Sequence, residues 1–137
     1  MMKILYSLML LFLFTSNIYG KTIDAIEVDE LESYMQKGVI IIDIRNEKKW
    51  KKTGIIPSSY RLTYMNSKKD NNEKKWLYIL VRIIKDKNRA FVLVSKDGKK
   101  AKDLALKLYK EKKFSNVLYL KGGVDSWIDA DRKMINY

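Results

Sequence analysis

Short apolar runs alternate with longer amphipathic stretches along this chain. The runs at 39–44, 90–94 and 117–120 are rich in β-branched residues and too short to form helices, so they predict buried parallel strands. The stretches at 27–37 and 99–110 place apolar residues at helical spacing and predict amphipathic helices. Strands that alternate with helices predict an α/β fold whose central parallel sheet is covered by helices on both faces.

Several other stretches carry weaker patterns. Residues 25–27 fit either a short first strand or an extended lead-in, and residues 60–64 alternate in the manner of a short strand. Residues 73–84 favour a helix, although the β-branched composition of 77–84 leaves a strand open. The apolar face of that helix would contain Trp76, Ile79, Leu80 and Ile83. The remaining predictions are a helical turn anchored by Trp50 at 46–52, a mobile polar loop at 66–72 and a short helix at 124–130.

Residues 1–20 have the pattern of a secretory signal peptide. Lys3 supplies a positive start, and residues 4–14 form an apolar run that is shorter than the ~20 residues needed to span a bilayer. Cleavage after the small residue Gly20 would leave a single domain at 21–137. An uncleaved N-terminal anchor is the alternative, and without it we expect no membrane span. Both forms predict an exported domain, either in a bacterial periplasm or secreted.

The formal net charge of the 137-residue chain is +12, but the lysines are scattered through every segment. Because no recognition motif accompanies this charge, we do not expect nucleic-acid binding. The absence of cysteine excludes disulfides and thiolate catalysis, and the absence of histidine removes the commonest metal ligand and general base. We therefore expect neither a metal nor a cofactor, and we expect a monomer.

A strand, a tight polar turn and a helix start follow one another at 90–108. Backbone N–H groups in such a turn and the positive end of the helix dipole together form a cradle for an anion. The first side chain after the strand is Ser95, which stands in that field. The predicted loop consists of Ser95, Lys96, Asp97, Gly98, Lys99, Lys100 and Ala101. The apolar stripe of the helix that follows consists of Ala101, Leu104, Ala105 and Leu108.

Other polar residues also fall where predicted strands end. Asp43 and Arg45 follow one strand, and Gly122 and Gly123 follow another. Because the ligand crevice of a parallel sheet lies at the carboxyl ends of its strands, we expect these residues to share one face with the loop. We interpret Asp43 and Arg45 as a pair that braces nearby loops, and the two glycines as positions that permit a positive φ.

These motifs, in this order, resemble those of the rhodanese family. The family's active loop follows a central strand and reads roughly Cys-Arg-x-Gly-x-Arg-Ser/Thr, where this chain has residues 95–101. The segment 40–45 resembles the family strand that ends in Asp-x-Arg, and 54–59 resembles its Gly-His-Ile-Pro-Gly-Ala segment. Residues 116–127 resemble its closing strand, Gly-Gly turn and tryptophan helix. The resemblance covers about residues 25–130 and implies a rhodanese-like fold with a central five-stranded parallel sheet.

The chain departs from the family pattern at the residues that carry chemistry. The family's nucleophilic cysteine falls on Ser95, its loop arginines fall on Lys96 and Lys100, and its histidine falls on Ile55. A serine forms no stable persulfide, and a serine nucleophile needs a neighbouring base. We therefore expect no catalytic residue. The expected function is that of a binding or accessory module, which holds a small inorganic anion or a protein partner at this loop.

Two other functions stay open at this point. The first is an enzyme, with residual sulfurtransferase activity by another route or with Ser95 as the nucleophile of a hydrolase. The second is a basic surface that binds envelope polyanions, whose binding would weaken with salt. The loop itself is open to two interpretations: an anion site formed by Lys96, Lys99 and Lys100, or only the tight turn that the fold requires.

Overall fold

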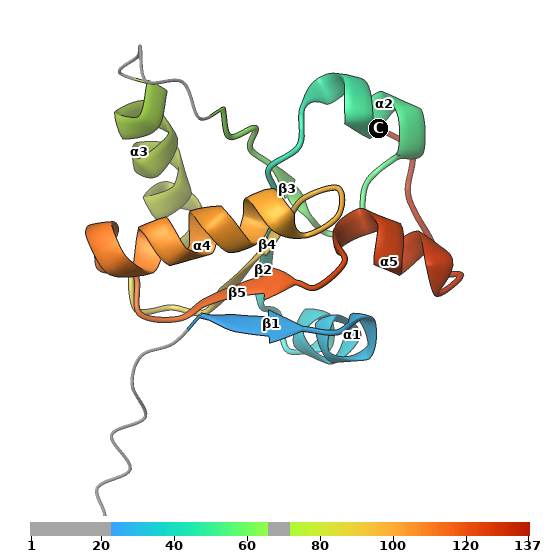
Figure 1. Ribbon diagram of the computed structural model, residues 1–137, viewed down its shortest axis with the longest axis horizontal. Coiled ribbons are helices and arrows are strands. Elements are labelled where there is room, and N and C mark those ends of the chain that lie inside the picture. Colours follow the sequence, from blue (N-terminus) through green and yellow to red (C-terminus); the bar gives the residue numbers. More distant parts are fainter. Residues whose placement is uncertain (1–22, 66–71) are drawn as a thin grey trace, which may run out of the picture.

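The computed structural model describes residues 23–65 and 72–137, in which strands and helices alternate (Figure 1). The strands are β1 (Asp24–Ile26), β2 (Ile40–Asp43), β3 (Tyr60–Arg61), β4 (Phe91–Val94) and β5 (Val117–Leu120). The helices are α1 (Val28–Gln36), α2 (Glu47–Thr53), α3 (Asn72–Ile84), α4 (Lys99–Lys112) and α5 (Gly123–Asp129). The expected signal peptide at 1–20 and most of the polar loop at 66–72 lie outside the described residues.

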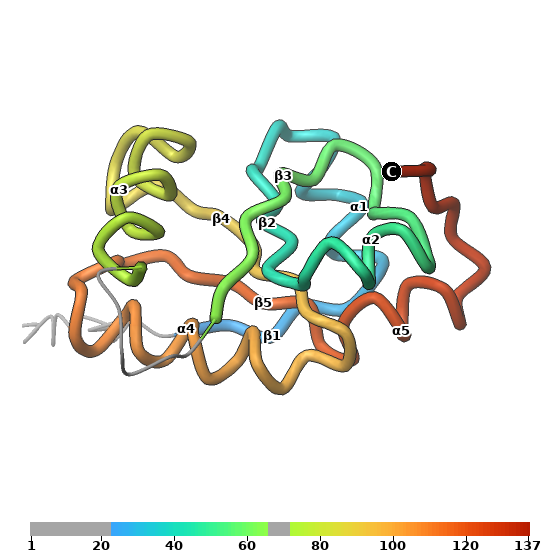
Figure 2. Tube along the Cα trace, turned by 90° about the horizontal axis from the view of Figure 1, so that it is seen from above, coloured from blue at the N-terminus to red at the C-terminus, as the bar shows by residue number. Residues whose placement is uncertain are grey.

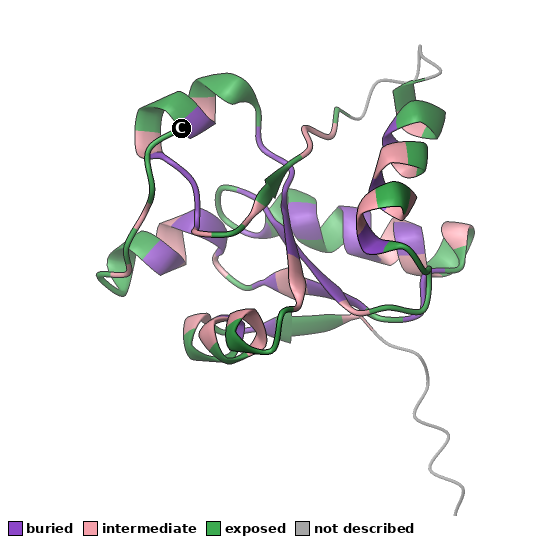
Figure 3. Cartoon of the chain, turned by 180° about the vertical axis from the view of Figure 1, so that it is seen from behind, coloured by how far each residue is buried: buried purple, intermediate pink, exposed green. Residues whose placement is uncertain are grey.

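The strands form one parallel sheet in the order β1-β5-β4-β2-β3. The central strand β4 pairs with β2 and β5, and all four of its residues are buried (Figure 3). A strand that is covered on both faces must be apolar at every position, which explains its uninterrupted apolar run. The structure confirms the predicted α/β fold with a five-stranded parallel sheet.

The two faces of the sheet carry separate hydrophobic cores. Ile42 and Leu93 belong to the core covered by α3 and α4, whereas Ile41 and Val92 belong to the core covered by α1 and α5. Neighbours along a strand enter different cores because successive side chains point to opposite faces. The predicted stripe of α4 lies fully in the first core, through Ala101, Leu104, Ala105 and Leu108.

Residues 72–84 form a helix, so the strand alternative at 77–84 is wrong. The buried face of α3 consists of Trp76, Leu80 and Ile84 at four-residue spacing, while Ile79 and Ile83 are only partly buried at its flank. Packing of this face against the sheet outweighs the weak preference of β-branched residues for strands.

The two edge strands are short. Residues 24–26 form β1, which pairs with β5, so the strand interpretation is correct but the strand begins and ends one residue before the predicted 25–27. The predicted strand at 60–64 is reduced to Tyr60–Arg61. The chain beyond β3 still follows β2, because Leu62 N–H donates to Asp43 O at 2.9 Å and Tyr64 N–H donates to Ile44 O at 3.0 Å.

The C-terminal residues form hydrogen bonds with the loop after α2. The sequence pattern did not predict this contact. Ile135 and Ile55 exchange two backbone hydrogen bonds of 2.9 Å in an antiparallel bridge. The Tyr137 hydroxyl donates to Glu47 at 3.1 Å, and the guanidinium of Arg61 lies 4.4 Å from the Tyr137 ring centre. The end of the chain therefore lies beside α2 (Figure 2). None of the described helices is long and apolar enough to cross a membrane.

Candidate functional site

The loop between β4 and α4 is held against the turn between β5 and α5. Val124 N–H donates to Ser95 O at 2.9 Å, and Asp125 N–H donates to Lys96 O at 3.0 Å. These carbonyls can approach because Gly123 has no side chain: a Cβ there would collide with both of them. The conformation of the loop is therefore set by its contact with α5 as well as by its own sequence.

Gly98 ends the loop at the N-cap of α4 with a φ of 89°. A Cβ at this position would lie 3.0 Å from both Gly122 N and Leu120 O, so only glycine fits without a shift of the backbone. Gly122 and Gly123 have φ values of 73° and 60°, which confirms the positive φ expected for both. These glycines therefore allow the turn before α4 and the turn before α5 to pack closely against each other.

Ser95 is 3% exposed at the base of this loop. Its Oγ accepts hydrogen bonds from Gly98 N–H at 3.1 Å and from Ala101 N–H at 3.2 Å. A hydroxyl has two acceptor lone pairs and one proton to donate. Both lone pairs of Ser95 are used, and within residues 23–65 and 72–137 no acceptor takes its proton. Ser95 is therefore a fixed hydrogen-bond donor that lines a cavity.

Asp43 and Arg45 form a buried ion pair at the end of β2, as expected. The Arg45 Nη2 atom lies 2.8 Å from Asp43 Oδ2, and the side chains are 4% and 1% exposed. The same guanidinium donates to Gly54 O and to Thr53 Oγ1, each at 2.9 Å. Since its donors are engaged by the protein, Arg45 braces the end of α2 against the sheet.

A cavity of about 890 Å³ opens beside the loop. Its walls come from the loop and first turns of α4, from the segment between β2 and α2, and from residues 63–65 after β3. The cationic residues that line it are Arg45, Lys49, Lys96, Lys99, Lys100 and Lys107. Two carboxylates, those of Asp97 and Asp103, also line it.

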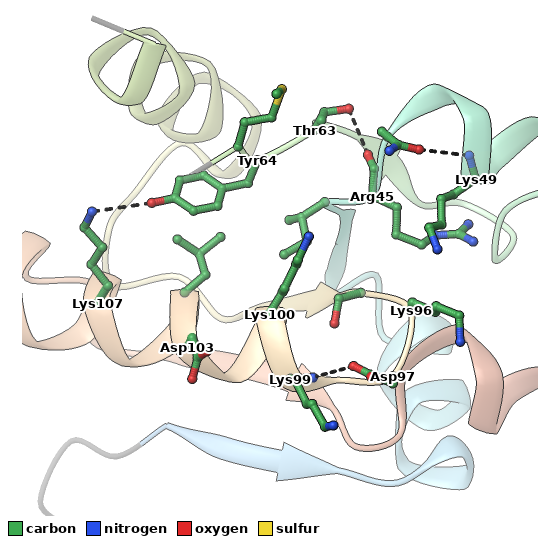
Figure 4. A pocket seen from close by; sticks show the side chains of 15 residues that line it. Arg45, Lys49, Thr63, Tyr64, Lys96, Asp97, Lys99, Lys100, Asp103 and Lys107 are labelled. Carbon is green, nitrogen blue, oxygen red and sulfur yellow. Dashed lines mark hydrogen bonds between the residues drawn. The ribbon is translucent and has the colours of Figure 1, made fainter. Parts of the chain in front are cut away.

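The lysines of α4 occupy different parts of this cavity (Figure 4). Lys100 extends from the first turn of α4 toward the wall that carries Arg45 and Thr63, whereas Lys99 extends the other way. Two turns further along α4, the Lys107 Nζ lies 3.4 Å from the Tyr64 hydroxyl. The cavity thus runs along one face of α4, from the loop to Tyr64.

The lysines also differ in their electrostatic partners. Lys96 pairs with Asp125 at 2.8 Å, and this hydrogen bond raises the pKa of the Lys96 ammonium, which therefore cannot act as a neutral base at pH 7. Lys107 pairs with Glu73 at 2.8 Å, and that hydrogen bond likewise raises the Lys107 pKa. In the described part of the chain, no carboxylate lies within ion-pair distance of the remaining lysines, Lys49, Lys99 and Lys100.

Asp97 caps the first turn of α4 from inside the loop. Its Oδ1 accepts a hydrogen bond from Lys99 N–H at 3.0 Å, which lowers the pKa of the Asp97 carboxyl and keeps it ionised. The N–H groups of Gly98, Lys99 and Ala101 are therefore bonded within the loop already. Part of the expected cradle of N–H groups is therefore used within the loop, and the Ser95 hydroxyl and the lysine side chains line the cavity beside it.

Some of the predicted site residues line the cavity, and the others hold the cavity-lining residues in place. Ser95, Lys96, Asp97, Lys99, Lys100 and Arg45 line the cavity. Asp43, Gly98, Ala101, Gly122 and Gly123 lie behind it and hold the loop or Arg45 in place. Sequence reasoning missed Tyr64 and Lys107, although the position of Lys107 seven residues after Lys100 on one helix face was a usable signal. No group of residues suited to hold a metal ion occurs among those the structure describes.

Comparison with solved structures supports the same fold. A protein of unknown function from Rhodopseudomonas palustris CGA009, described as a possible tyrosine phosphatase, superposes with a TM-score of 0.64 at 20% identity over 82% of this chain and 85% of that one. A rhodanese-like domain protein from Staphylococcus aureus gives 0.54 at 18% identity over 76% and 90%. A thiosulfate sulfurtransferase from Pseudomonas aeruginosa gives 0.66 at 11% identity over 82% of this chain and only 20% of that longer protein.

Sequence comparison identifies the family. No curated protein sequence matches the chain significantly. The family model of the rhodanese-like domain, however, matches residues 27–130, which include strands β2 to β5, the α4 loop and the turn before α5. The chain therefore belongs to the rhodanese-like family, as a member that contains no cysteine with which to carry out the family's thiolate chemistry.

Proposed function

We propose that this chain is a binding module that holds an anion at the α4 loop and transfers no sulfur. The observation that carries the proposal is the state of Ser95. Its buried hydroxyl accepts two backbone hydrogen bonds, and no acceptor in the described part of the chain takes its proton, which a ligand in the lysine-lined cavity could accept in a hydrogen bond. A hydroxyl donor in a cavity that Lys100 also lines favours an acceptor that carries negative charge.

The lack of a base argues against Ser95 as a nucleophile. The chain has no histidine, and the neighbouring Lys96 is held in its charged form by Asp125. Among the described residues, the hydrogen-bond partners of the Ser95 oxygen are N–H donors, which do not accept its proton. A serine hydroxyl in this setting stays protonated, and oxygen does not replace sulfur in a persulfide. We extend the proposal to an exported protein, on the pattern of residues 1–20 alone.

Calorimetric titration with sulfate, phosphate and thiosulfate tests the anion site directly. Lys100→Ala should weaken binding about tenfold, because one charge-assisted contact is worth roughly 1.5 kcal/mol. Lys102→Ala is the matched control, since Lys102 is an exposed lysine of the same helix that does not line the cavity. It should change the affinity less than about twofold, since distant surface charges are screened. An equal loss of affinity in the two variants would mean that the anion is attracted by the overall positive charge of the protein and not by a specific site.

A sulfurtransferase assay with thiosulfate and cyanide distinguishes a binding module from an active enzyme. The native chain should show no more activity than a variant in which Lys96, Lys99 and Lys100 are all alanine. Activity above that variant would contradict the proposal.

Ser95→Cys should create a thiol with a pKa below about 7.5, because the N–H groups of Gly98 and Ala101 and the start of α4 stabilise a thiolate. The rate of alkylation as a function of pH measures this pKa. Ser33→Cys is the control on the exposed face of α1, where the thiol should titrate near the ordinary value of about 8.5.

The pKa of the thiol in Ser95→Cys also shows whether an anion is bound at the loop. Saturating sulfate should raise the pKa of the thiol at position 95, since a neighbouring negative charge disfavours the thiolate, and should leave the thiol at position 33 unchanged. If sulfate moved both values equally or neither, sulfate would have no site at the loop.

A further inference from the structure

The cavity beside the α4 loop is far larger than a small inorganic anion. Its volume of about 890 Å³ falls in the upper part of the range of roughly 300–1,000 Å³ that holds organic ligands of drug size. An oxyanion hydrogen-bonded to Ser95 would fill only the end next to the loop. The rest of the cavity has a different chemical character, which indicates what else the ligand contains.

The wall away from the loop is largely apolar. Tyr64, Met65 and Leu104 line it, and Leu104 belongs to the core that fixes α4 against the sheet. This wall faces the cavity over the second and third turns of α4, whereas Ser95 and Lys100 lie at the beginning of the helix. A ligand that fills the cavity must therefore be polar at one end and apolar along its body.

Tyr64 provides a fixed aromatic surface on this wall. Its ring packs edge-on against Trp76, with 5.1 Å between the ring centres and 71° between the planes. The Trp76 indole N–H is itself bonded to Leu62 O at 3.1 Å, and the Tyr64 hydroxyl lies 3.4 Å from Lys107 Nζ. A ring held by two neighbours offers contact area without a large loss of side-chain freedom on binding.

The charges along the cavity favour one acidic group and not two. Lys107, at the Tyr64 end, is already paired with Glu73 at 2.8 Å. Asp103 lies between Lys100 and Lys107 and would repel a second acid there. Lys100, in the first turn of α4, has no carboxylate within ion-pair distance among the described residues. The favourable place for negative charge is therefore the loop end alone.

We propose that the ligand is a small organic anion with a single acid group and an aromatic or other apolar body. This inference rests on the proposed anion site and specifies its ligand. The acid group accepts a hydrogen bond from the Ser95 hydroxyl and contacts Lys100, and the body packs between Leu104 and Tyr64. Lys100 and Lys107 are seven residues apart on the helix, about 10 Å at 1.5 Å per residue, which is the length of an acid group joined to two fused rings.

Methanesulfonate, benzenesulfonate and naphthalene-2-sulfonate test the inference, because the head group and its charge stay constant while the body grows. Calorimetry should give an affinity that rises about tenfold or more from the first to the third, since each 1.4 kcal/mol from apolar burial is a factor of ten. The neutral 2-naphthol should bind at least tenfold more weakly than naphthalene-2-sulfonate. Lys100→Ala should weaken all three sulfonates by the same factor.

Tyr64→Ala should remove most of the advantage of naphthalene-2-sulfonate and leave methanesulfonate unchanged. Met65→Ala offers a second variant without a risk to folding, because Met65 is 71% exposed while it lines the same wall. It should lower the naphthalene-2-sulfonate affinity severalfold. Tyr78→Ala is the control, since Tyr78 is an exposed tyrosine of α3 that lies outside the cavity lining.

The outcomes separate this inference from the proposal on which it rests. Equal affinities for the three sulfonates would overturn the organic ligand and keep an inorganic anion site. A Tyr64→Ala variant that weakened methanesulfonate as much as naphthalene-2-sulfonate would also overturn it. Failure of sulfate and of every sulfonate to bind would contradict the anion site itself.

Discussion

Gly123→Ala is expected to lower the free energy of unfolding by about 3 kcal/mol. The new Cβ would collide with the carbonyl oxygens of Ser95 and Lys96, and both belong to the backbone, so the α4 loop must move as a unit. Overpacking of this kind costs roughly 1–3 kcal/mol, and the left-handed conformation of a non-glycine residue adds roughly 1–2 kcal/mol. Urea denaturation at 25 °C measures the loss.

Gly38→Ala is the matched control for this substitution. Gly38 has a φ of 76°, similar in sign to the 60° of Gly123, but a Cβ there would meet no atom within 4 Å. Its loss should therefore be about 1 kcal/mol, from the backbone conformation alone. Equal losses at the two positions would mean that the contact between the α4 loop and α5 is not tight.

Arg45→Met is expected to lower the free energy of unfolding by about 3–5 kcal/mol, because it leaves the carboxylate of Asp43 buried without its counter-ion. The substitution also removes the donors to Thr53 and to Gly54 O, which hold the end of α2. Chemical denaturation with guanidinium chloride or urea checks the value.

Two further variants identify the cause of this loss. Arg132→Met removes an arginine whose ion pairs to Asp29 and Glu32 lie at the surface, and it should cost less than about 1 kcal/mol. Combining Arg45→Met with Asp43→Leu should recover part of the stability, because no unpaired charge remains. A loss below about 1 kcal/mol for Arg45→Met would show that the pair is not buried in solution.

The inner part of the sheet could be predicted from the sequence because its signal is local. Both faces of β4 are covered, so the strand had to be an unbroken apolar run bounded by polar turns. The edges gave weaker signals: β3 has only two residues, both exposed, and continues as an irregular segment. The bridge between Ile55 and Ile135 could not be predicted, since no periodic pattern records a contact between residues so far apart in the chain.

The same distinction applies to the candidate site. The α4 loop is a continuous strand-turn-helix segment, so Ser95 and its neighbours could be located from residue types and spacing. The internal hydrogen bonds of Ser95 and Asp97, which occupy three loop N–H groups, depend on side-chain geometry that spacing does not specify. Tyr64 comes from the irregular segment after β3, and its place opposite α4 follows only from the order of the strands.

Ser95 also determines how the proposed anion-binding end of the cavity responds to oxidants. A cysteine at the base of this loop would pass to sulfenic and then sulfinic acid, and each step would change its charge and size. This stepwise oxidation does not occur at the serine hydroxyl, the lysine ammonium groups or the backbone amides. The proposed recognition of negative charge at this end of the cavity should therefore be the same in reducing and in oxidising surroundings.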